Sequence, residues 1–204
     1  MTRPRGLVLG IVIVTIGVVV ATVVATRHHR HPAPKPAPVV ATSAYHFLDP
    51  PPQFAAGNVP PEETAAVTIA LGAGGSVPTH FGTSDGQFAV SLAAGAIAPA
   101  AGATSVTVQI TPLVPRHLRP LPRGLRANGN AYQVDMKYEP SGVAVTRLAK
   151  AGVLKFEIPE PGPSLFVSPD ATAWSLLPTR SLPPHELILS TRFSGAGYYL
   201  AGTR

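Results

Sequence analysis

The sequence has no cysteine among its 204 residues, and acidic side chains are few, 10 against 16 lysines and arginines. Without cysteine, a disulfide scaffold, a cysteine-ligated zinc site and a thiol nucleophile are excluded. Residues 1–44 carry five basic side chains and no acidic one, whereas residues 45–204 carry 11 basic and 10 acidic. Because the positive excess flanks an apolar run and the remainder is nearly neutral, the composition argues against nucleic-acid binding.

A single long apolar run covers residues 6–26, reading GLVLGIVIVTIGVVVATVVAT, and contains no charged residue. At about 1.5 Å per residue, a helix of this length spans the roughly 30 Å hydrocarbon core of a bilayer. We therefore expect residues 1–26 to form a short tail and an uncleaved membrane anchor. A secretory signal peptide is the alternative, since Val23 and Ala25 fit a small-residue cleavage pattern.

Small residues within this run recur in steps of four or seven, so a helix places them within one sector. They are Gly6, Gly10, Gly17 and Ala21, followed by Ala25. Small residues on one helix face let two helices approach closely, as in the GxxxG mode. The pattern predicts a homodimer formed through the membrane helix.

Residues 27–63 are rich in proline, including the stretch HPAPKPAP at residues 31–38. Alternate prolines favour extended polyproline geometry and oppose packing, so we expect an extracytoplasmic linker that holds a domain away from the membrane. The cluster Arg27–His31 is interpreted as a basic collar at the lipid headgroups; the alternative is a transition-metal site. Arginine outnumbers lysine 12 to 4, which is typical of a GC-rich bacterial genome.

From residue 64 onward, short stretches alternate between apolar and polar positions and are separated by turn residues. Alternation with a period of two is typical of strands with one face in a core. The pattern predicts an all-β fold for residues 64–204, an antiparallel β-sandwich of seven to nine strands. The apolar positions that define it are Val67/Ile69/Leu71, Phe88/Val90/Leu92, Val106/Val108/Ile110, Tyr132/Val134/Met136/Tyr138, Leu154/Phe156/Ile158, Leu187/Leu189/Thr191/Phe193 and Tyr198/Leu200.

Several short motifs follow one another in an order that resembles ZU5 domains. They are Ala93–Ile97, then Val106–Pro112, Ala131-Tyr132 with Glu139–Gly142, Val153–Pro159, Trp174–Leu177 and Thr191–Ser194 before Tyr198-Tyr199. Two departures from the family pattern are Ala93, where ZU5 domains place proline, and the additional residues 145–151. The resemblance covers residues 67–200 and implies a sandwich used for protein–protein contacts, without catalysis.

Candidate catalytic groups in the sandwich have simpler structural interpretations. His80, Ser84 and Asp85 lie within six residues, whereas catalytic triads are assembled from separate elements, so Ser84–Gly86 is predicted to form a hairpin turn. Gly95 is predicted to adopt a positive φ in a turn. Glu157 alternates with core positions and is expected to face water, and Trp174 is expected in the core. No catalytic, cofactor or metal site is predicted.

Four arginines, Arg116, Arg119, Arg123 and Arg126, occur in a stretch with no acidic residue between Gln109 and Asp135. Pro115, Pro120 and Pro122 oppose a regular helix or central strand, so a long exposed loop is expected. Arginine guanidinium groups bind phosphates and carboxylates, which makes these residues candidates for an anionic partner. The alternative is a solvated loop whose charges serve only solubility.

Two functions of different class remain open from the sequence. The first is a membrane-tethered, non-catalytic extracytoplasmic module that binds a protein or an anionic component of the cell envelope. The second is an exported hydrolase whose active site is assembled from distant loops. The anchor, the linker and the predicted sandwich favour the first.

Overall fold

The structure is a computed structural model, and it describes residues 45–118, 120–121, 123–183 and 185–204. These residues contain twelve β-strands and two short 3₁₀ helices, Pro52–Phe54 (η1) and Pro115–His117 (η2), so the all-β class expected from the sequence is confirmed. Within these ranges no helix has the length and apolar character needed to span a membrane. The predicted anchor, with Gly6, Gly10, Gly17 and Ala21, lies outside the described residues.

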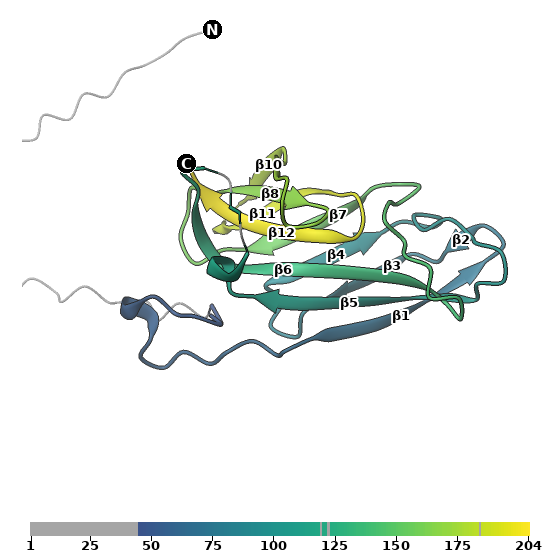
Figure 1. Ribbon diagram of the computed structural model, residues 1–204, viewed down its shortest axis with the longest axis horizontal. Helices are drawn as coiled ribbons and strands as arrows, with labels where there is room; N and C mark the ends of the chain where they lie inside the picture. The colour runs from purple at the N-terminus through teal and green to yellow at the C-terminus, as the bar shows by residue number, and fades with distance from the viewer. Residues whose placement is uncertain (1–44, 119, 122, 184) are drawn as a thin grey trace, which may run out of the picture. The chain divides into compact units, whose positions relative to one another are not determined.

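The larger sheet has seven strands in the order β2-β1-β5-β6-β12-β8-β9. Their bounds are Gly75–Ser76 (β2), Ala65–Gly72 (β1), Ser105–Leu113 (β5), Arg126–Glu139 (β6), Gly197–Thr203 (β12), Ser164–Ser168 (β8) and Ser175–Leu176 (β9). All pairings are antiparallel, as predicted. Figure 1 shows β1, β5 and β6 running side by side along this layer.

The second sheet has five strands in the order β10-β11-β7-β4-β3 and is also antiparallel. Its strands are Thr179–Leu182 (β10), His185–Phe193 (β11), Gly152–Glu157 (β7), Phe88–Leu92 (β4) and Thr79–Gly82 (β3). Side chains at alternate positions of both sheets form one core cluster, so the two-sheet sandwich is confirmed.

Aromatic rings from both sheets occupy the centre of this core. The Phe88 ring centroid lies 5.0 Å from that of Tyr132 and 5.6 Å from that of Tyr199. Phe156 meets Tyr132 edge-on at 5.2 Å. These four side chains are almost completely buried, and aromatic pairs add about 0.5–1.5 kcal/mol each beyond area burial. The alternation predicted for β4, β6 and β7 therefore identifies core residues correctly.

Two predicted turns are confirmed. Asp85 Oδ1 accepts hydrogen bonds from Thr83 Oγ1 at 2.6 Å and from the Gln87 main-chain N–H at 3.0 Å, while Gly86 has a φ of +75°. Gly95 has a φ of +67°, and a Cβ built there would lie 2.9 Å from the carbonyl oxygen of Gly74. A side chain at residue 95 is therefore opposed by both backbone conformation and space.

The last strand differs from the predicted alternation. Tyr199 belongs to the core between the sheets, whereas Leu200 lies on the opposite face in a second apolar cluster with Leu118 and Ala131. β12 is buried on both faces because the loop between β5 and β6 covers the outer face there. Leu187 also departs from the prediction, since it is 37 % exposed.

Candidate functional site

The segment before the first strand is packed onto the sandwich. Tyr45 and Phe47 are 4 % and 3 % exposed, and their ring centroids lie 4.6 Å apart. We call residues 45–48 the docking segment. The sequence predicted residues 27–63 to be a linker that does not pack; the structure instead shows that packing begins at least as early as Tyr45, and it says nothing of residues 27–44.

Three side-chain amides hold the main chain of the docking segment. The Gln87 side-chain amide forms hydrogen bonds with both main-chain groups of His46. The Asn58 side-chain amide accepts a hydrogen bond from the Phe47 N–H at 2.9 Å and donates one to the Phe47 carbonyl at 3.0 Å. Asn130 Oδ1 accepts from the Leu48 N–H at 3.0 Å, and Asn130 Nδ2 donates to the His46 carbonyl at 2.7 Å. Each amide supplies a donor and an acceptor, so main-chain groups that no strand pairs are satisfied.

The docking segment is also held from β6. The main-chain N–H of Asn130 donates to the Tyr45 hydroxyl at 2.9 Å, and a Cβ at Gly129, whose φ is +83°, would lie 2.5 Å from that hydroxyl. Burial raises the pKa of Tyr45 well above its usual value and raises the pKa of Tyr132 to about 12. Both phenols therefore stay neutral in the folded protein at physiological pH.

Two adjoining hollows lie between the docking segment, its continuation and the start of β6. The first, about 300 Å³, is lined by Phe47, Pro51, Pro52, Gln53, Phe54, Arg126, Ala127, Asn128, Gly129, Pro159, Glu160, Pro161 and Thr203. The second, about 190 Å³, shares Phe47, Pro51, Ala127 and Gly129 and adds Asp49, Val114, Pro115, Arg116 and Asn130. We call the two together the end groove.

The end groove combines an apolar wall with polar groups. Phe47 and Phe54 stack with ring centroids 5.3 Å apart, and prolines continue this wall. Asn128 Nδ2 donates to the Glu160 carbonyl at 3.4 Å, whereas Asn128 Oδ1 is buried and has no hydrogen-bond partner within the described part of the chain. A buried acceptor of this kind suits a bound molecule that donates a hydrogen bond.

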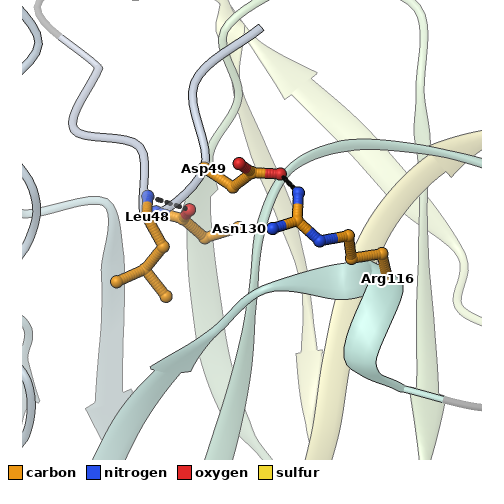
Figure 2. Close-up of polar contacts among 4 residues, drawn as sticks. All are labelled: Leu48, Asp49, Arg116 and Asn130. Carbon is orange, nitrogen blue, oxygen red and sulfur yellow. Dashed lines mark hydrogen bonds and ion pairs between the residues drawn. The ribbon is translucent and has the colours of Figure 1, made fainter.

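The structure places the predicted arginines in different situations. Arg116 lies in η2 and forms an ion pair with Asp49, which the sequence did not place near it (Figure 2). Arg123 is exposed in the loop, and Arg126 is the exposed first residue of β6. Arg119 lies outside the described residues. Arg116 and Arg126 therefore line the end groove, and Arg123 belongs to the connection beside it.

The connection between β5 and β6, residues 114–125, is a loop, as predicted, and we call it the Arg-rich loop. Its leucines turn toward the sheet: Leu118 is buried with Ala131 and Leu200, and Leu121 and Leu125 pack against them. Trp174 joins this cluster, half-buried, and donates from Nε1 to the Pro120 carbonyl at 3.1 Å. Trp174 was expected on a strand in the core, but it precedes β9 and supports the loop.

The possible triad does not assemble as a unit. The His80 ring nitrogen Nδ1 bonds Ser91 Oγ at 3.0 Å on the outer side of β3 and β4, whereas Asp85 serves the hairpin turn. Glu157, expected to face water, is half-buried. Burial and the nearby Asp85 carboxylate raise its pKa, while His46 opposes the shift. His80, Asp85 and Glu157 do not line the end groove.

Among the described residues no group of three histidine or acidic side chains has an arrangement suited to a metal ion. A comparison of the chain with protein-family models finds no match, and a comparison with curated proteins finds none either. The end groove, which the sequence did not indicate, therefore has to be interpreted from its own chemistry. The available sequence signal was the pair Tyr45 and Phe47, two aromatic residues two positions apart in a proline-rich stretch.

Proposed function

We propose that the chain is a membrane-tethered, non-catalytic extracytoplasmic interaction module. Its end groove and the adjoining arginines bind a partner that presents phosphate or carboxylate groups. The single observation that carries this proposal is the fixed position of the Arg-rich loop. Because Leu118, Leu121 and Leu125 pack against the sheet, the loop presents Arg116 and Arg123 from a supported backbone, with Arg116 lining the end groove.

A supported loop favours binding because less conformational freedom is lost when the partner arrives. Arginine also forms bidentate hydrogen bonds with phosphate and carboxylate. Both side chains of the Arg116–Asp49 ion pair are exposed, so the pair contributes at most about 1 kcal/mol to stability. An anionic ligand can therefore displace the Asp49 carboxylate. The stacked Phe47 and Phe54 supply an apolar contact next to the charges. The ZU5 resemblance is consistent with an interaction role.

The proposal is tested with the compact unit, residues 41–204, and vesicles that contain either neutral or anionic lipid. We expect binding only to anionic vesicles, decreasing with salt because attraction is screened over about 10 Å at 0.1 M. Trp174, the sole tryptophan, contacts the Arg-rich loop, so its fluorescence reports binding directly. Soluble polyanionic wall material in place of vesicles distinguishes a lipid surface from a polymer.

Two variants of equal charge localise the site. Changing Arg116, Arg119, Arg123 and Arg126 to serine removes the four positive charges of residues 116–126, and this variant is expected to lose binding. Changing Arg147, Lys155, Arg180 and Arg192 to serine removes four exposed positive charges elsewhere, and this variant should retain most of it. An equal loss of binding in both variants would show that the interaction depends only on the net charge of the domain. Loss only in the second would move the site away from the Arg-rich loop.

A further inference from the structure

One edge of the seven-stranded sheet is long, uncharged and open. β2 covers only the end of β1, where Leu71 and Gly72 pair with Ser76 and Gly75. Residues 65–70 of β1 pair with β5 on one side, and no strand of the described residues lies on the other. Figure 1 shows β1 at the border of its sheet. Within the described part of the chain, residues 65–70 therefore present an unpaired strand edge.

The hydrogen-bond pairing of β1 with β5 shows which main-chain groups of β1 point away from β5. The Leu71 N–H donates to the Thr104 carbonyl at 2.9 Å, so in this antiparallel register the odd-numbered residues direct their hydrogen bonds toward β5. Ala66, Thr68 and Ala70 then direct their N–H and C=O groups outward, and all three residues are exposed.

The other edges of the two sheets carry the usual protection against pairing. β2 and β9 have two residues each, and β3 and β10 have four. Pro78 precedes β3, and Pro178 and Pro183 flank β10. Short length and nearby proline both oppose addition of a strand. β1 has neither device, since the sequence AAVTIALG of Ala65–Gly72 contains no charge and no proline.

We propose that a second copy of this chain occupies the β1 edge, with the two β1 strands antiparallel about a two-fold axis at Thr68. In this register Thr68 faces Thr68, Ala66 faces Ala70, and Val67 faces Ile69 of the other copy. No like charges meet, the side chains on the hydrogen-bonded pairs are small, and the half-buried Val67 gains an apolar neighbour. β2 ends the pairing beyond Ala70, because it already occupies the edge at Leu71.

This inference rests on the sheet edge alone and is independent of the end groove and its ligand. The paired segment is short, so it buries less than the roughly 1,200 Å² of a stable interface. We therefore expect a weak dimer whose population rises with concentration. Confinement of the chains to one surface would increase that population, because it raises the effective concentration.

The test uses the compact unit, residues 41–204, so that association through the predicted membrane helix does not contribute, and measures its molecular mass over a range of concentrations by analytical ultracentrifugation. Thr68→Lys and Thr68→Glu each place like charges at the axis, and each is expected to weaken the dimer by roughly fivefold or more. An equimolar mixture of the two variants should recover association, since opposite charges then meet. Gln109→Lys adds the same charge one strand further in, on β5, and should dimerise like the wild type.

The mixture makes the result independent of any fault in folding of a single variant, because two misfolded proteins would not restore one another. A dimer that persists in both Thr68 variants, or a monomer at every concentration in the unaltered chain, would overturn the proposal. The absence of native cysteine allows a second measurement. Thr68→Cys should cross-link with a short bismaleimide far more efficiently than Gln109→Cys, and equal efficiency would also contradict the β1 pairing.

Discussion

Gln87 bonds both main-chain groups of His46 with its side-chain amide. The Gln87 Oε1 accepts from the His46 N–H at 2.5 Å, and Nε2 donates to the His46 carbonyl at 3.1 Å. A neighbouring β-strand would offer the same donor and acceptor to an extended chain. Gln87 is 1 % exposed, so breaking this contact would leave a buried amide without a partner, at about 1–3 kcal/mol. The docking segment is therefore a stable part of the domain.

The first prediction concerns the contact between Gly129 and Tyr45. Gly129→Ala should destabilise the domain by about 1–3 kcal/mol more than a positive φ alone explains, because the new methyl group displaces the buried Tyr45 ring. Gly102→Ala is the control, since Gly102 has a φ of +74° and no atom within 4 Å of the added Cβ. Urea denaturation of both variants measures the difference. Equal destabilisation would show that Tyr45 adapts without cost.

The second prediction is that limited digestion with proteinase K, a protease of broad specificity, leaves a fragment that still contains Tyr45, of roughly 17 kDa out of 21.1 kDa. A domain beginning at residue 64 would instead give a fragment about 2 kDa smaller. Asn130→Ala removes two hydrogen bonds to the docking segment, so it should expose residues 45–63 to cleavage and yield the smaller product. Gln133→Ala, on the outer face of β6, should be cleaved in the same way as the wild type. Mass spectrometry identifies the ends.

Digestion of intact cells that express the chain extends this experiment to the proposed membrane topology. Release of the same fragment without lysis is expected for an extracytoplasmic domain on a membrane anchor. Cleavage only after lysis would reverse the proposed orientation. Recovery of a soluble chain that lacks residues 1–25 would favour the signal-peptide alternative.

The third prediction is a loss of stability in alkali. A tyrosine has an unfolded pKa near 10, and burial raises the pKa of Tyr132 to about 12. Between these values the unfolded state releases a proton that the folded state retains, so stability is full below pH 10 and falls as pH rises toward 12. The contribution of Tyr132 is about 3 kcal/mol. Melting temperatures measured from pH 8 to 11.5 should therefore decline steeply.

Tyr132→Phe should make that decline shallower, since phenylalanine has no proton to release; part of the decline should remain, because burial also raises the pKa of Tyr45. Its melting temperature near pH 8 should be lower than that of the unaltered chain, because Gln87 Nε2 loses the Tyr132 hydroxyl, 3.2 Å away, as an acceptor. An unaltered slope in Tyr132→Phe would show that other groups cause the alkaline loss.

The fourth prediction concerns the ion pair of Arg116 with Asp49. Asp49→Asn removes the carboxylate opposite Arg116, so affinity for an anionic ligand at the end groove should rise by a few-fold at low salt. Asp135→Asn, further along β6, removes the same charge at a position that does not line the end groove. An equal rise in both variants would indicate a general charge effect, and no change in Asp49→Asn would separate Arg116 from the binding site.

Periodicity predicted the strands that have one buried face, such as β4 and β5, because alternation directly reflects that exposure. It did not identify β8, where Leu165 and Phe166 are both buried and lie on opposite faces, so apolar residues run together. Tyr199 was missed for the same reason, since both sides of β12 are covered. Strands of two residues, such as β2 and β9, are too short to carry a period.

The candidate site was predicted only in part, for a related reason. The four arginines stand out as a cluster in the sequence, and three of them lie in the described chain at or beside the end groove. Asp49 is 67 residues from Arg116, and Asn130 is 82 from Leu48. No local pattern encodes such pairings, because they depend on how the strands fold back on one another. The proline-rich composition also concealed the aromatic pair that anchors residues 45–48.

The position of β12 has a consequence for how the protein is made. Residues 197–203 lie between β6 and β8, so they connect the first-made strands of the large sheet to its later ones. During synthesis, β1, β5 and β6 emerge from the ribosome long before their neighbour in the sheet exists. The sheet closes only after residue 203 has been added, and until then the edge of β6 that β12 covers stays unpaired, a condition that favours aggregation. Secretion through a narrow channel, which requires an unfolded chain, is compatible with such delayed closure.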